Sequence, residues 1–454
     1  MVEEQQLQHE NKMGTMHIPQ LLFSMALPAI ISMFVQAMYN IVDSVFVAQT
    51  GENALTAVSL AFPVQMLIVS CFVGMGVGIN SGISRRLGEK KHREAEMVAE
   101  HGFLVAVILS LAAAVLGAVF SNIFVKMFTD NPEIIKGCTD YLLIVTIFSF
   151  GSIITQAGFS TLQGSGDMIQ PMIGQLIGAI TNIILDPIMI FGLLGCPAMG
   201  VKGAAYATVI GQITAFLLYI VVYKRRRFAV EIHPKYLKFE KSMILQIYSV
   251  GIPSSIMMTL PSILVSILNR ILGGFSDVYV AVLGVYFKLQ TFIYMPANGI
   301  VQGMRPLVGY NYGAGEKERV KSIIRYSLLS AGCIMLIGTV LSLAIPGQIF
   351  ALFDAEESLL KAGILALRLI SLGFLVSTIG VIYSGVFESL GEGKHSLLIS
   401  LLRQFIITIP CAVALSAVWG PAGVWASFPI GEVCASVAAL ILLKRYQGGA
   451  YAPF

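Results

Sequence analysis

Three acidic residues lie inside long apolar runs of this sequence, where a charged side chain is unusual. Asp43 lies in the run 18–48, Asp186 lies in the run 169–192, and Glu432 lies near the C-terminus. A carboxylate in the core of a bilayer is costly unless it faces protein or water, so intramembrane acids generally have a function. Asp43 and Asp186 therefore indicate a buried site that holds a cation or a proton.

Amide side chains accompany both acids at helical spacing. Gln36, Asn40 and Asp43 recur at intervals of four and three residues, so they share one face of a helix. Asn182 precedes Asp186 by one turn and lies on the same face. Both polar faces are expected to point away from lipid.

Two hydroxyl groups are expected near the depth of the acids. The first and fifth runs start inside, so their acids fall in the outer half of the membrane, and the oppositely directed fourth and sixth runs bring Tyr141 and Thr208 close to that level. Such oxygen ligands suit Na⁺ or an exchangeable proton. The candidate cation or proton site is Asp43, Tyr141, Asn182, Asp186 and Thr208. A bound Na⁺ would use these residues without the tyrosine.

Two prolines are expected to shape the helices that carry the acids. Pro28 removes one backbone hydrogen bond in the first run, which predicts a bend there. Pro187 frees a backbone carbonyl beside Asp186, and this oxygen is a suitable ligand for a cation.

The composition places these residues in a membrane. Hydrophobic residues make up 56% of the chain and charged residues only 12%, which predicts a polytopic membrane protein. The continuous apolar runs lack the alternation of barrel strands, so an all-α fold of twelve transmembrane helices is expected. The expected spans are 18–48, 54–80, 97–124, 138–160, 169–192, 200–223, 242–271, 279–302, 320–345, 361–387, 396–418 and 421–443.

The chain also repeats itself. ALP at 26–28 is matched by GIP at 251–253, and GEK at 88–90 is matched by GEK at 315–317, with further matches at similar offsets. The repeat predicts two homologous six-helix bundles of the same orientation. The expected parts are a tail at 1–17, bundles at 18–223 and 242–445, a basic linker at 224–241 and a tail at 446–454.

Lysine and arginine predict the orientation of the chain. They gather in the second, sixth and eighth connections, whereas the odd-numbered connections are poor in base and often acidic. Basic loops stay inside, so both termini are expected in the cytoplasm of a cell whose inner (plasma) membrane the chain spans many times. The net charge of +4 sits in these loops and does not indicate nucleic acid.

Several classes of activity are excluded by missing motifs. The sequence has no Walker A motif and no HExxH, and GEGKHS at 391–396 lacks the spacing of a phosphate loop. The six cysteines are scattered without a CxxC, which predicts packing residues rather than a metal site or a disulfide framework. We expect a protein that is not an enzyme and needs no cofactor beyond a coupling ion.

The second half differs because its deep charges are mostly basic. Lys288 and Arg368 are the expected partners of Glu432 in a structural ion pair. Methionine and aromatic side chains at helical positions favour an adaptable wall for apolar ligands. The residues proposed for a substrate cavity are Gln36, Tyr39, Asn40, Met257, Lys288 and Met295.

Five segments of this sequence resemble the multidrug and toxic compound extrusion (MATE) transporters. They are YNIVDSVFVAQTG in the first span, SRRLGEKK after the second, NIILDP in the fifth, GAAYAT in the sixth and RPLVGYNYGAGE after the eighth. The resemblance covers nearly the whole chain. It implies a monomeric secondary antiporter that exports cationic amphipathic compounds against an inward gradient of H⁺ or Na⁺, by alternating access.

The resemblance extends to one branch of the family, the DNA-damage-inducible transporters. In that branch the cation site lies in the first bundle, and the match implies the five oxygen-bearing residues named above, with Pro28 as the bending point. The branch with acids in its second bundle fits less well, because this chain has Pro261 and Ser377 at the approximate positions of those acids. A rival interpretation is a flippase for lipid-linked sugars, whose pyrophosphate Lys288 and Arg368 would receive.

Overall fold

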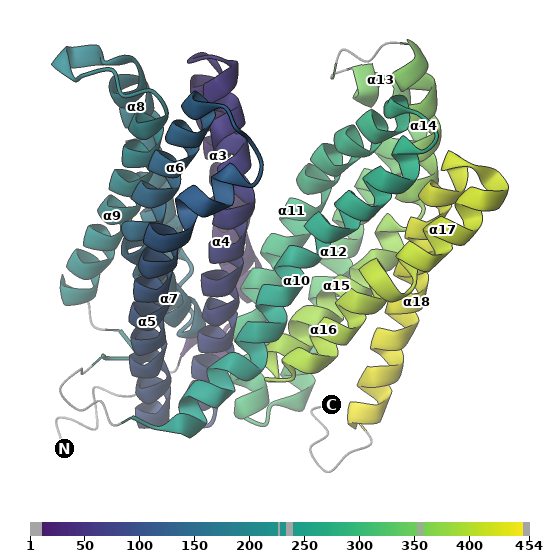
Figure 1. The fold of residues 1–454 in the computed structure, drawn as a ribbon. Helices are drawn as coiled ribbons and strands as arrows, with labels where there is room; N and C mark the ends of the chain where they lie inside the picture. Colours follow the sequence, from purple (N-terminus) through teal and green to yellow (C-terminus); the bar gives the residue numbers. More distant parts are fainter. Residues whose placement is uncertain (1–10, 226–227, 233–238, 352, 354–356, 448–454) are drawn as a thin grey trace, which may run out of the picture. The chain divides into compact units, whose positions relative to one another are not determined.

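The computed structural model describes residues 11–225, 228–232, 239–351, 353 and 357–447, and these residues form helices without strands (Figure 1). Ten of the described helices are long and apolar enough to cross a membrane. Two further spans each consist of two helices that meet at a sharp bend, which brings the total to twelve. The predicted all-helical membrane fold with twelve spans is confirmed.

The chain divides into two compact units. The N-terminal unit is Ile31–Ser255, and the C-terminal unit combines Met1–Ile30 with Ile256–Phe454. The predicted bundles at 18–223 and 242–445 differ from these units, because each unit contains the first part of a helix that the sequence repeat assigned to the other half. The predicted tails and the basic linker fall partly outside the described residues.

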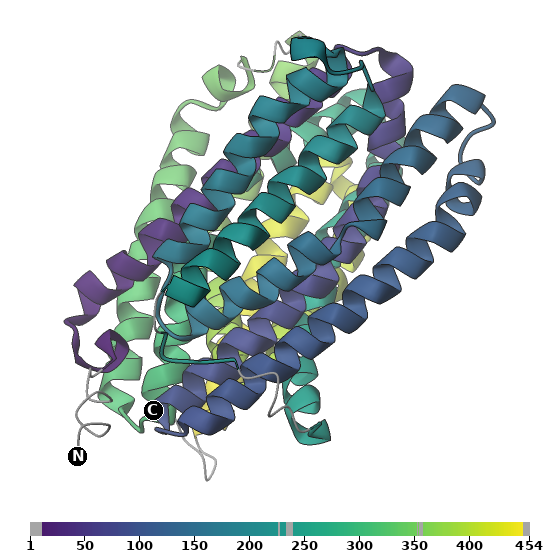
Figure 2. The same cartoon turned by 90° about the vertical axis from the view of Figure 1, so that its left-hand side faces the viewer.

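The N-terminal unit is built from long helices that run side by side (Figure 2). It contains the second part of α3 and the first part of α10. Its elements are α3 (Ile18–Ala48), α4 (Glu52–Gly88), α5 (His92–Lys126), α6 (Pro132–Ile147), α7 (Phe150–Gly164), α8 (Ile169–Phe191), the short 3₁₀ turn η1 (Leu193–Gly195), α9 (Val201–Arg225) and α10 (Lys241–Gly273).

The C-terminal unit has the same succession of spans with more interruptions. It contains the first part of α3 and the second part of α10. Its other elements are α2 (Lys12–Thr15), α11 (Asp277–Gly313), α12 (Lys317–Ala344), α13 (Pro346–Ala351), α14 (Glu357–Ser371), α15 (Phe374–Ser389), α16 (Gly393–Leu401), the π-helical segment η3 (Leu402–Ile406), α17 (Thr408–Trp419) and α18 (Pro421–Gln447).

Local sequence explains where several helices begin and end. The Asn131 side chain accepts a hydrogen bond from the Glu133 backbone at the start of α6, and Pro132 occupies the first turn, where its missing N–H costs nothing. Ser276 caps α11 in the same way. Gly192 ends α8 in the left-handed conformation that glycine adopts without strain. Polar caps thus replace the hydrogen bonds that helix ends lack.

The two broken spans occupy equivalent places in the repeat. α6 and α7 meet at an angle of 43° around Phe148, and α14 and α15 meet at 51° around Leu372 in the second half. The sequence predicted one continuous span in each case. Serine hydroxyls near both breaks bond to backbone carbonyls of their own turn, and such competition bends helices. The Ser152 hydroxyl donates to the Ser149 carbonyl oxygen, and the Ser371 hydroxyl donates to the Arg368 carbonyl oxygen.

Glycines allow α10 to cross α4 with almost no separation. A Cβ on Gly74 would lie 2.5 Å from the Gly251 carbonyl oxygen, and a Cβ on Gly78 would clash with the Ile247 carbonyl oxygen. In the C-terminal unit α11 meets α3 equivalently, because a Cβ on Gly303 would lie 2.6 Å from the Ala26 nitrogen. The two crossings occupy corresponding places in the repeat, and both use small residues to bring backbones together.

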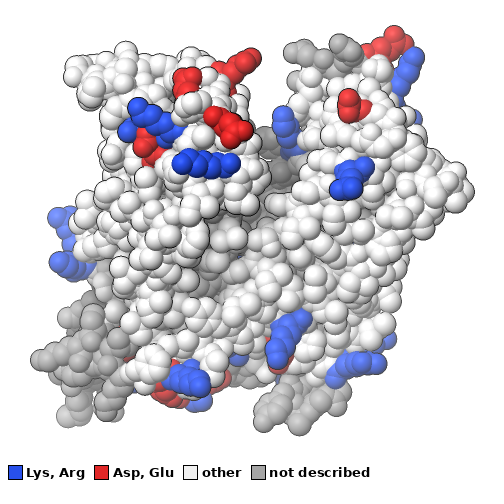
Figure 3. Space-filling view, viewed as in Figure 1, with Lys and Arg blue, Asp and Glu red and all other residues white. Residues whose placement is uncertain are grey.

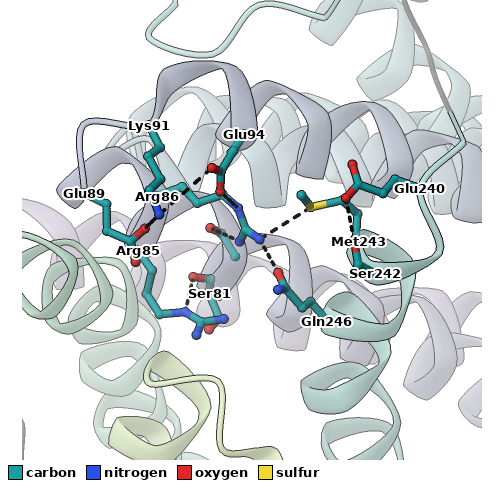
Figure 4. A network of polar contacts seen from close by, with 11 residues as sticks. Ser81, Arg85, Arg86, Glu89, Lys91, Glu94, Glu240, Ser242, Met243 and Gln246 are labelled. Carbon is teal, nitrogen blue, oxygen red and sulfur yellow. Dashed lines mark hydrogen bonds and ion pairs between the residues drawn. The ribbon is translucent and has the colours of Figure 1, made fainter. Parts of the chain in front are cut away.

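Polar contacts fix the first turns of α10 to the N-terminal unit (Figure 4). Arg86, buried near the end of α4, donates to the Gln246 side-chain oxygen, and its Nε lies 3.4 Å from a Glu94 oxygen. His101 accepts a hydrogen bond from the Glu240 backbone N–H at 2.9 Å. We call the contacts of Arg86 the arginine clasp. The clasp satisfies a buried guanidinium and holds α10 in place.

The C-terminal unit holds the start of α3 by an equivalent device. Asn311 donates to the Met13 carbonyl oxygen at 2.9 Å, and Arg319 donates to the Asn311 side-chain oxygen at 2.9 Å and to the Met16 carbonyl oxygen at 3.0 Å. By the match of the two GEK segments, Asn311 and Arg319 correspond to Ser84 and His92, each two positions before Arg86 and Glu94. The repeat therefore preserves the anchoring role while it changes the residues.

Charged side chains on the face in Figure 3 lie mostly toward the ends of the helices, with a broad uncharged band between them. This distribution fits a protein that spans a membrane. In the basic loop after α4, Lys91 lies 2.8 Å from the Glu89 carboxylate, which raises the pKa of the Lys91 ammonium. Lys91 therefore stays charged and adds to the positive charge of this loop.

Gly78→Ala is expected to destabilise the protein, because a methyl group there meets the backbone of α10. Overpacking of this kind costs about 1–3 kcal/mol. Gly332→Ala in α12 is the matched control, since a Cβ there has no neighbour within 4 Å. Thermal unfolding of the purified protein should show a lower Tm for Gly78→Ala alone. Equal Tm values for both variants would show that the close crossing is not needed.

Candidate functional site

The N-terminal unit brings Asp43 of α3 and Asp186 of α8 together. Asp186 is fully buried and Asp43 is half-buried, and the charge of Asp43 acts on Asp186. Two neighbouring carboxylates repel each other in a low-dielectric interior. The pair therefore favours a positive charge, either a proton or a cation, at its oxygens.

Asn182 connects this acid pair to α9. Its side-chain nitrogen lies 3.3 Å from an Asp186 oxygen and 3.4 Å from the Thr208 hydroxyl. The first contact follows from the helical spacing of four residues. The second depends on glycines at the crossing of α8 and α9, where a Cβ on Gly211 would lie 2.7 Å from the Gly178 carbonyl oxygen. The glycines thus bring α8 and α9 close enough for Asn182 to contact Thr208.

Two tyrosines complete the polar surroundings. Tyr141 of α6 is buried and its hydroxyl accepts a hydrogen bond from Gln65 of α4 at 3.1 Å. The charge of Asp43 acts on both Tyr141 and Tyr39. Tyr39 lies beside Thr208. The five residues proposed from the sequence therefore lie in one polar cluster with Tyr39 and Gln65, which we call the acid-pair cluster.

Sequence reasoning missed Gln65 and gave Tyr39 a different place. Gln65 is a lone amide in the long apolar helix α4, and its position has no periodic polar neighbours to draw attention to it. An amide without a hydrogen-bond partner is unfavourable in hydrocarbon. Any glutamine in the middle of a membrane helix is therefore a candidate for a contact inside the protein, and this argument could have identified Gln65. Tyr39 was assigned to a cavity wall, although it also contacts Thr208.

Several oxygens of the cluster are buried without a hydrogen-bond partner among the described residues. They are Asp43 Oδ1, Asn182 Oδ1 and Asp186 Oδ2. Hydrogen-bond acceptors without a partner are costly in a low-dielectric interior, so they indicate a proton or a cation that binds to these oxygens. Hard cations such as Na⁺ and the proton prefer oxygen, whereas the described residues contain no group of three or more His, Cys, Asp or Glu for a transition metal.

No basic side chain among the described residues compensates the two acids. Neither Asp43 nor Asp186 forms an ion pair there, and the groups that act on them are each other and the neutral side chains of Asn182, Tyr39 and Tyr141. A buried acid that had a purely structural role would normally be paired with Arg or Lys. The positive charge that this cluster requires must therefore come from outside the described protein groups.

The remaining predicted residues are dispersed. Pro28 lies within α3, which continues as a helix on both sides of it, and Pro187 lies within α8 directly after Asp186. Gln36 and Asn40 are exposed on α3, two turns and one turn before Asp43. The bend at Pro28 and the use of the Pro187 region as a cation ligand stay predictions.

The predicted cavity residues of the C-terminal unit differ in exposure. Met257 is half-buried, and its sulfur receives hydrogen bonds from Ser396 at 3.3 Å and Ser400 at 3.0 Å. Met295 is buried and Lys288 is exposed. Their participation in a substrate cavity also stays a prediction.

The predicted partners of Glu432 were wrong. Glu432 pairs with Arg403, whose Nε lies 3.1 Å from a Glu432 oxygen, while Lys288 and Arg368 are exposed. The physical reason is the π-helical segment η3, which carries Arg403 and shifts the faces of its helix relative to a regular α-helix. The prediction of a structural ion pair for Glu432 named the wrong bases.

An all-helical fold with a repeated set of spans and a buried acid pair defines a multi-pass membrane transporter. A family model described as MatE matches residues 28–188 and again residues 253–414. The chain therefore belongs to the MatE family. The two matches begin at Pro28 and at Pro253, which are the two prolines that the sequence repeat pairs with each other.

Individual relatives support the same assignment. The multidrug export protein MepA of Staphylococcus aureus (strain MRSA252) is 26% identical over 419 residues, which are 92% of this chain and 92% of that protein. A multidrug resistance MATE family transporter in an outward-facing conformation is similar with a TM-score of 0.87 and 26% identity, over 96% of each chain. A MOP superfamily transporter from Pyrococcus furiosus, described as having a binding pocket of reverse polarity, gives a TM-score of 0.87, 26% identity and coverage of 96% and 97%.

Thr208→Val is expected to destabilise the N-terminal unit, because it removes the hydroxyl that Asn182 and Tyr39 contact. A lost hydrogen bond of this kind costs about 1 kcal/mol. Thr214→Val on the same helix is the control, since the Thr214 hydroxyl bonds only to the Ile210 carbonyl in the described structure. Thermal unfolding should separate the two variants. A larger loss in Thr214→Val would contradict the proposed role of Thr208.

Proposed function

We propose that this MatE family transporter is a secondary antiporter that exports cationic amphipathic compounds in exchange for H⁺ or Na⁺. The observation that carries the proposal is the contact between Asp43 and Asp186, whose charge no described base compensates. The name of the Staphylococcus relative, a multidrug export protein, supports small organic compounds as the substrates. The relatives reported above do not support the narrower resemblance to the DNA-damage-inducible branch.

The coupling site of the proposal is Asp43, Tyr141, Asn182, Asp186 and Thr208, with Tyr39 and Gln65 as supporting groups. A cationic compound or Na⁺ binds the ionised acid pair, and a proton that arrives from outside replaces it. Exchange then requires only that the two ligands compete for the same oxygens and that the site opens to one side of the membrane at a time. Na⁺ would use the oxygens of the acids, the amide and the threonine.

The surroundings of the site complete the proposal. Gln36 and Asn40 of the N-terminal unit are proposed substrate contacts. Met257 and Met295 of the C-terminal unit are proposed as well, because methionine adapts to ligands of different shape. The basic loops support an orientation in the inner (plasma) membrane with both termini in the cytoplasm. The transporter works as a monomer, with no enzymatic step and no cofactor other than the coupling ion.

Asp43→Asn and Asp186→Asn should each reduce driven efflux to the level of empty vesicles. The amide preserves the size of the side chain and can still form hydrogen bonds, but it no longer binds a cation by charge. The measurement is drug-stimulated H⁺ or ²²Na⁺ flux in proteoliposomes, which also identifies the coupling ion. Wild-type flux in both variants would refute the coupling role of the acids.

Asp140→Asn is the matched control for this experiment. Asp140 lies in α6 of the same unit, but it forms an ion pair with Lys202 at 3.0 Å and is not among the groups that act on Asp43 or Asp186. Partly exposed pairs contribute about 0–1 kcal/mol, so folding should survive the change. Transport by Asp140→Asn should equal that of wild type, which separates the effect of site chemistry from a general loss of acid.

The rival function is a flippase for lipid-linked sugars. The exposed Lys288 and Arg368 favour it, and the Pyrococcus relative is described as having a binding pocket of reverse polarity. Asp43 and Asp186 oppose it, because carboxylates repel pyrophosphate. A flippase should move a fluorescent lipid pyrophosphate across vesicles and lose this activity in Arg368→Gln. The exporter should show no such movement and should keep its drug efflux in that variant.

A further inference from the structure

The C-terminal unit contains a buried ion pair at a place where three irregular helices meet. Glu432 is 8% exposed and lies three residues after Pro429, which interrupts the hydrogen bonds of α18. Arg403 lies in the π-helical segment η3. At the break between α14 and α15, a Cβ on Gly373 would lie 3.0 Å from Pro429 Cα and 3.3 Å from Glu432 Cγ. Figure 1 shows α14, α15 and α18 among the green and yellow helices of the C-terminal part of the chain, where α18 contacts α14, α15 and η3.

The irregular backbone at this place is itself satisfied by side chains. The Thr408 hydroxyl donates to the Arg403 carbonyl oxygen at 2.5 Å, and Gly431 of α18 leaves the space that this hydroxyl occupies. Backbone that departs from the α-helix is tolerated inside a membrane only where protein or water covers it, and π segments occur frequently at functional sites. The π-helical segment around Arg403 therefore indicates a functional site.

The ion pair leaves one oxygen of Glu432 unused. Oε1 faces Arg403 Nε at 3.1 Å, whereas Oε2 is buried without a hydrogen-bond partner among the described residues. An ionised carboxylate that is buried away from water normally accepts several hydrogen bonds, because each lone pair without a donor is costly. A proton on Glu432 would remove this cost by neutralising the group.

Arg403 has a second attractive contact besides Glu432. Its guanidinium lies 5.8 Å from the centre of the Tyr294 ring, within the range of a cation–π interaction. The Tyr294 hydroxyl donates to the Ser377 hydroxyl at 2.8 Å, which fixes the ring. Arg403 therefore keeps a favourable position for its charge when it is released from Glu432.

The groups that face Glu432 from the neighbouring elements are mostly neutral. α11 contributes Tyr286 and Tyr294, on which the charge of Glu432 acts. Behind them, Ser377 of α15 contacts Tyr294, and Thr408 of α17 contacts the Arg403 carbonyl oxygen. Arg403 is the one charged group that acts on Glu432 within the described residues. The charge of this carboxyl group is consequently controlled by a single internal cation.

We propose that Glu432 is a second proton-binding site of this protein and that Arg403 is the internal cation that competes with the proton for it. In the exchange, a proton bonds to a Glu432 carboxylate oxygen and the ion pair with Arg403 separates. Arg403 keeps its own proton, because a guanidinium does not lose it in proteins. The cluster changes from neutral to a single positive charge, and no other reactant is needed.

This site differs from the acid-pair cluster in the origin of the positive charge. In the N-terminal unit the acids require an ion from outside, whereas in the C-terminal unit the protein carries its own cation on η3. Protonation of Glu432 adds one positive charge to the C-terminal unit. The proton site goes beyond the proposed coupling site and does not depend on it.

Infrared difference spectroscopy of the protein in lipid vesicles, between alkaline and acidic pH, tests the proposal directly. Protonation of a carboxylate produces a carbonyl band that can be assigned by substitution. The wild-type difference spectrum should contain a carbonyl band that is absent in Glu432→Gln. The same band should be present in the double variant Asp43→Asn/Asp186→Asn. This readout requires no transport, so it separates the proton site from the proposed antiport.

Two further variants keep the test decisive if a single change disturbs folding. Arg403→Gln/Glu432→Gln removes both charges, leaves no unpaired buried ion, and should lack the same band. In Arg403→Gln the carbonyl band of protonated Glu432 should already be present at alkaline pH, because the carboxyl group has lost its internal cation. Arg403→Lys should restore the wild-type change of this band between alkaline and acidic pH. Identical spectra for wild type and both Glu432 variants, or a wild-type response in Arg403→Gln, would overturn the proposal.

Discussion

The structure depends on one constraint, which is that every polar group inside the membrane span must find its partner within the protein. Hydrocarbon offers no hydrogen bonds, so each buried carboxylate, amide or hydroxyl must meet a complementary group. In the N-terminal unit Asp186 meets this requirement in part through Asn182, and its second oxygen is left for a proton or a cation. In the C-terminal unit Glu432 meets it in part through Arg403, and its second oxygen has no partner among the described residues. The same requirement therefore has two chemical solutions in one chain.

Close packing of helices makes these contacts possible. Gly211 lets α9 approach α8 so that Thr208 reaches Asn182, and Gly78 and Gly303 bring α10 and α3 against their neighbours. Interfaces of this kind gain van der Waals contact where no hydrophobic driving force exists between helices. The glycines thus determine distances, and the polar residues determine the chemistry that those distances allow.

α3 and α10 have a special place in this architecture, because each contributes to both compact units. The unit boundary falls two residues after Pro28 in α3 and two residues after Pro253 in α10. The arginine clasp and the contacts of Asn311 and Arg319 anchor the starts of these two helices. The repeat preserves this plan in both halves even though the anchoring residues differ.

The fold follows from the sequence alone. The length of an apolar run is a local property, so the sequence predicted the run 18–48, which equals α3, and the total of twelve spans. The spacing of four residues also predicted that Asn182 and Asp186 share a helix face, and their side chains are in contact. These predictions succeeded because they depend on the length and the periodicity of apolar runs, which the sequence contains directly.

Tertiary structure alone decided the partners. The contact of Gln65 with Tyr141, the contact of Tyr39 with Thr208 and the pairing of Glu432 with Arg403 join different helices, and their rotation about their own axes is set by packing. The breaks in two spans and the π segment around Arg403 shift helix faces away from the regular period. A one-dimensional pattern gives depth along a helix, but it does not give the direction in which a side chain meets its neighbour.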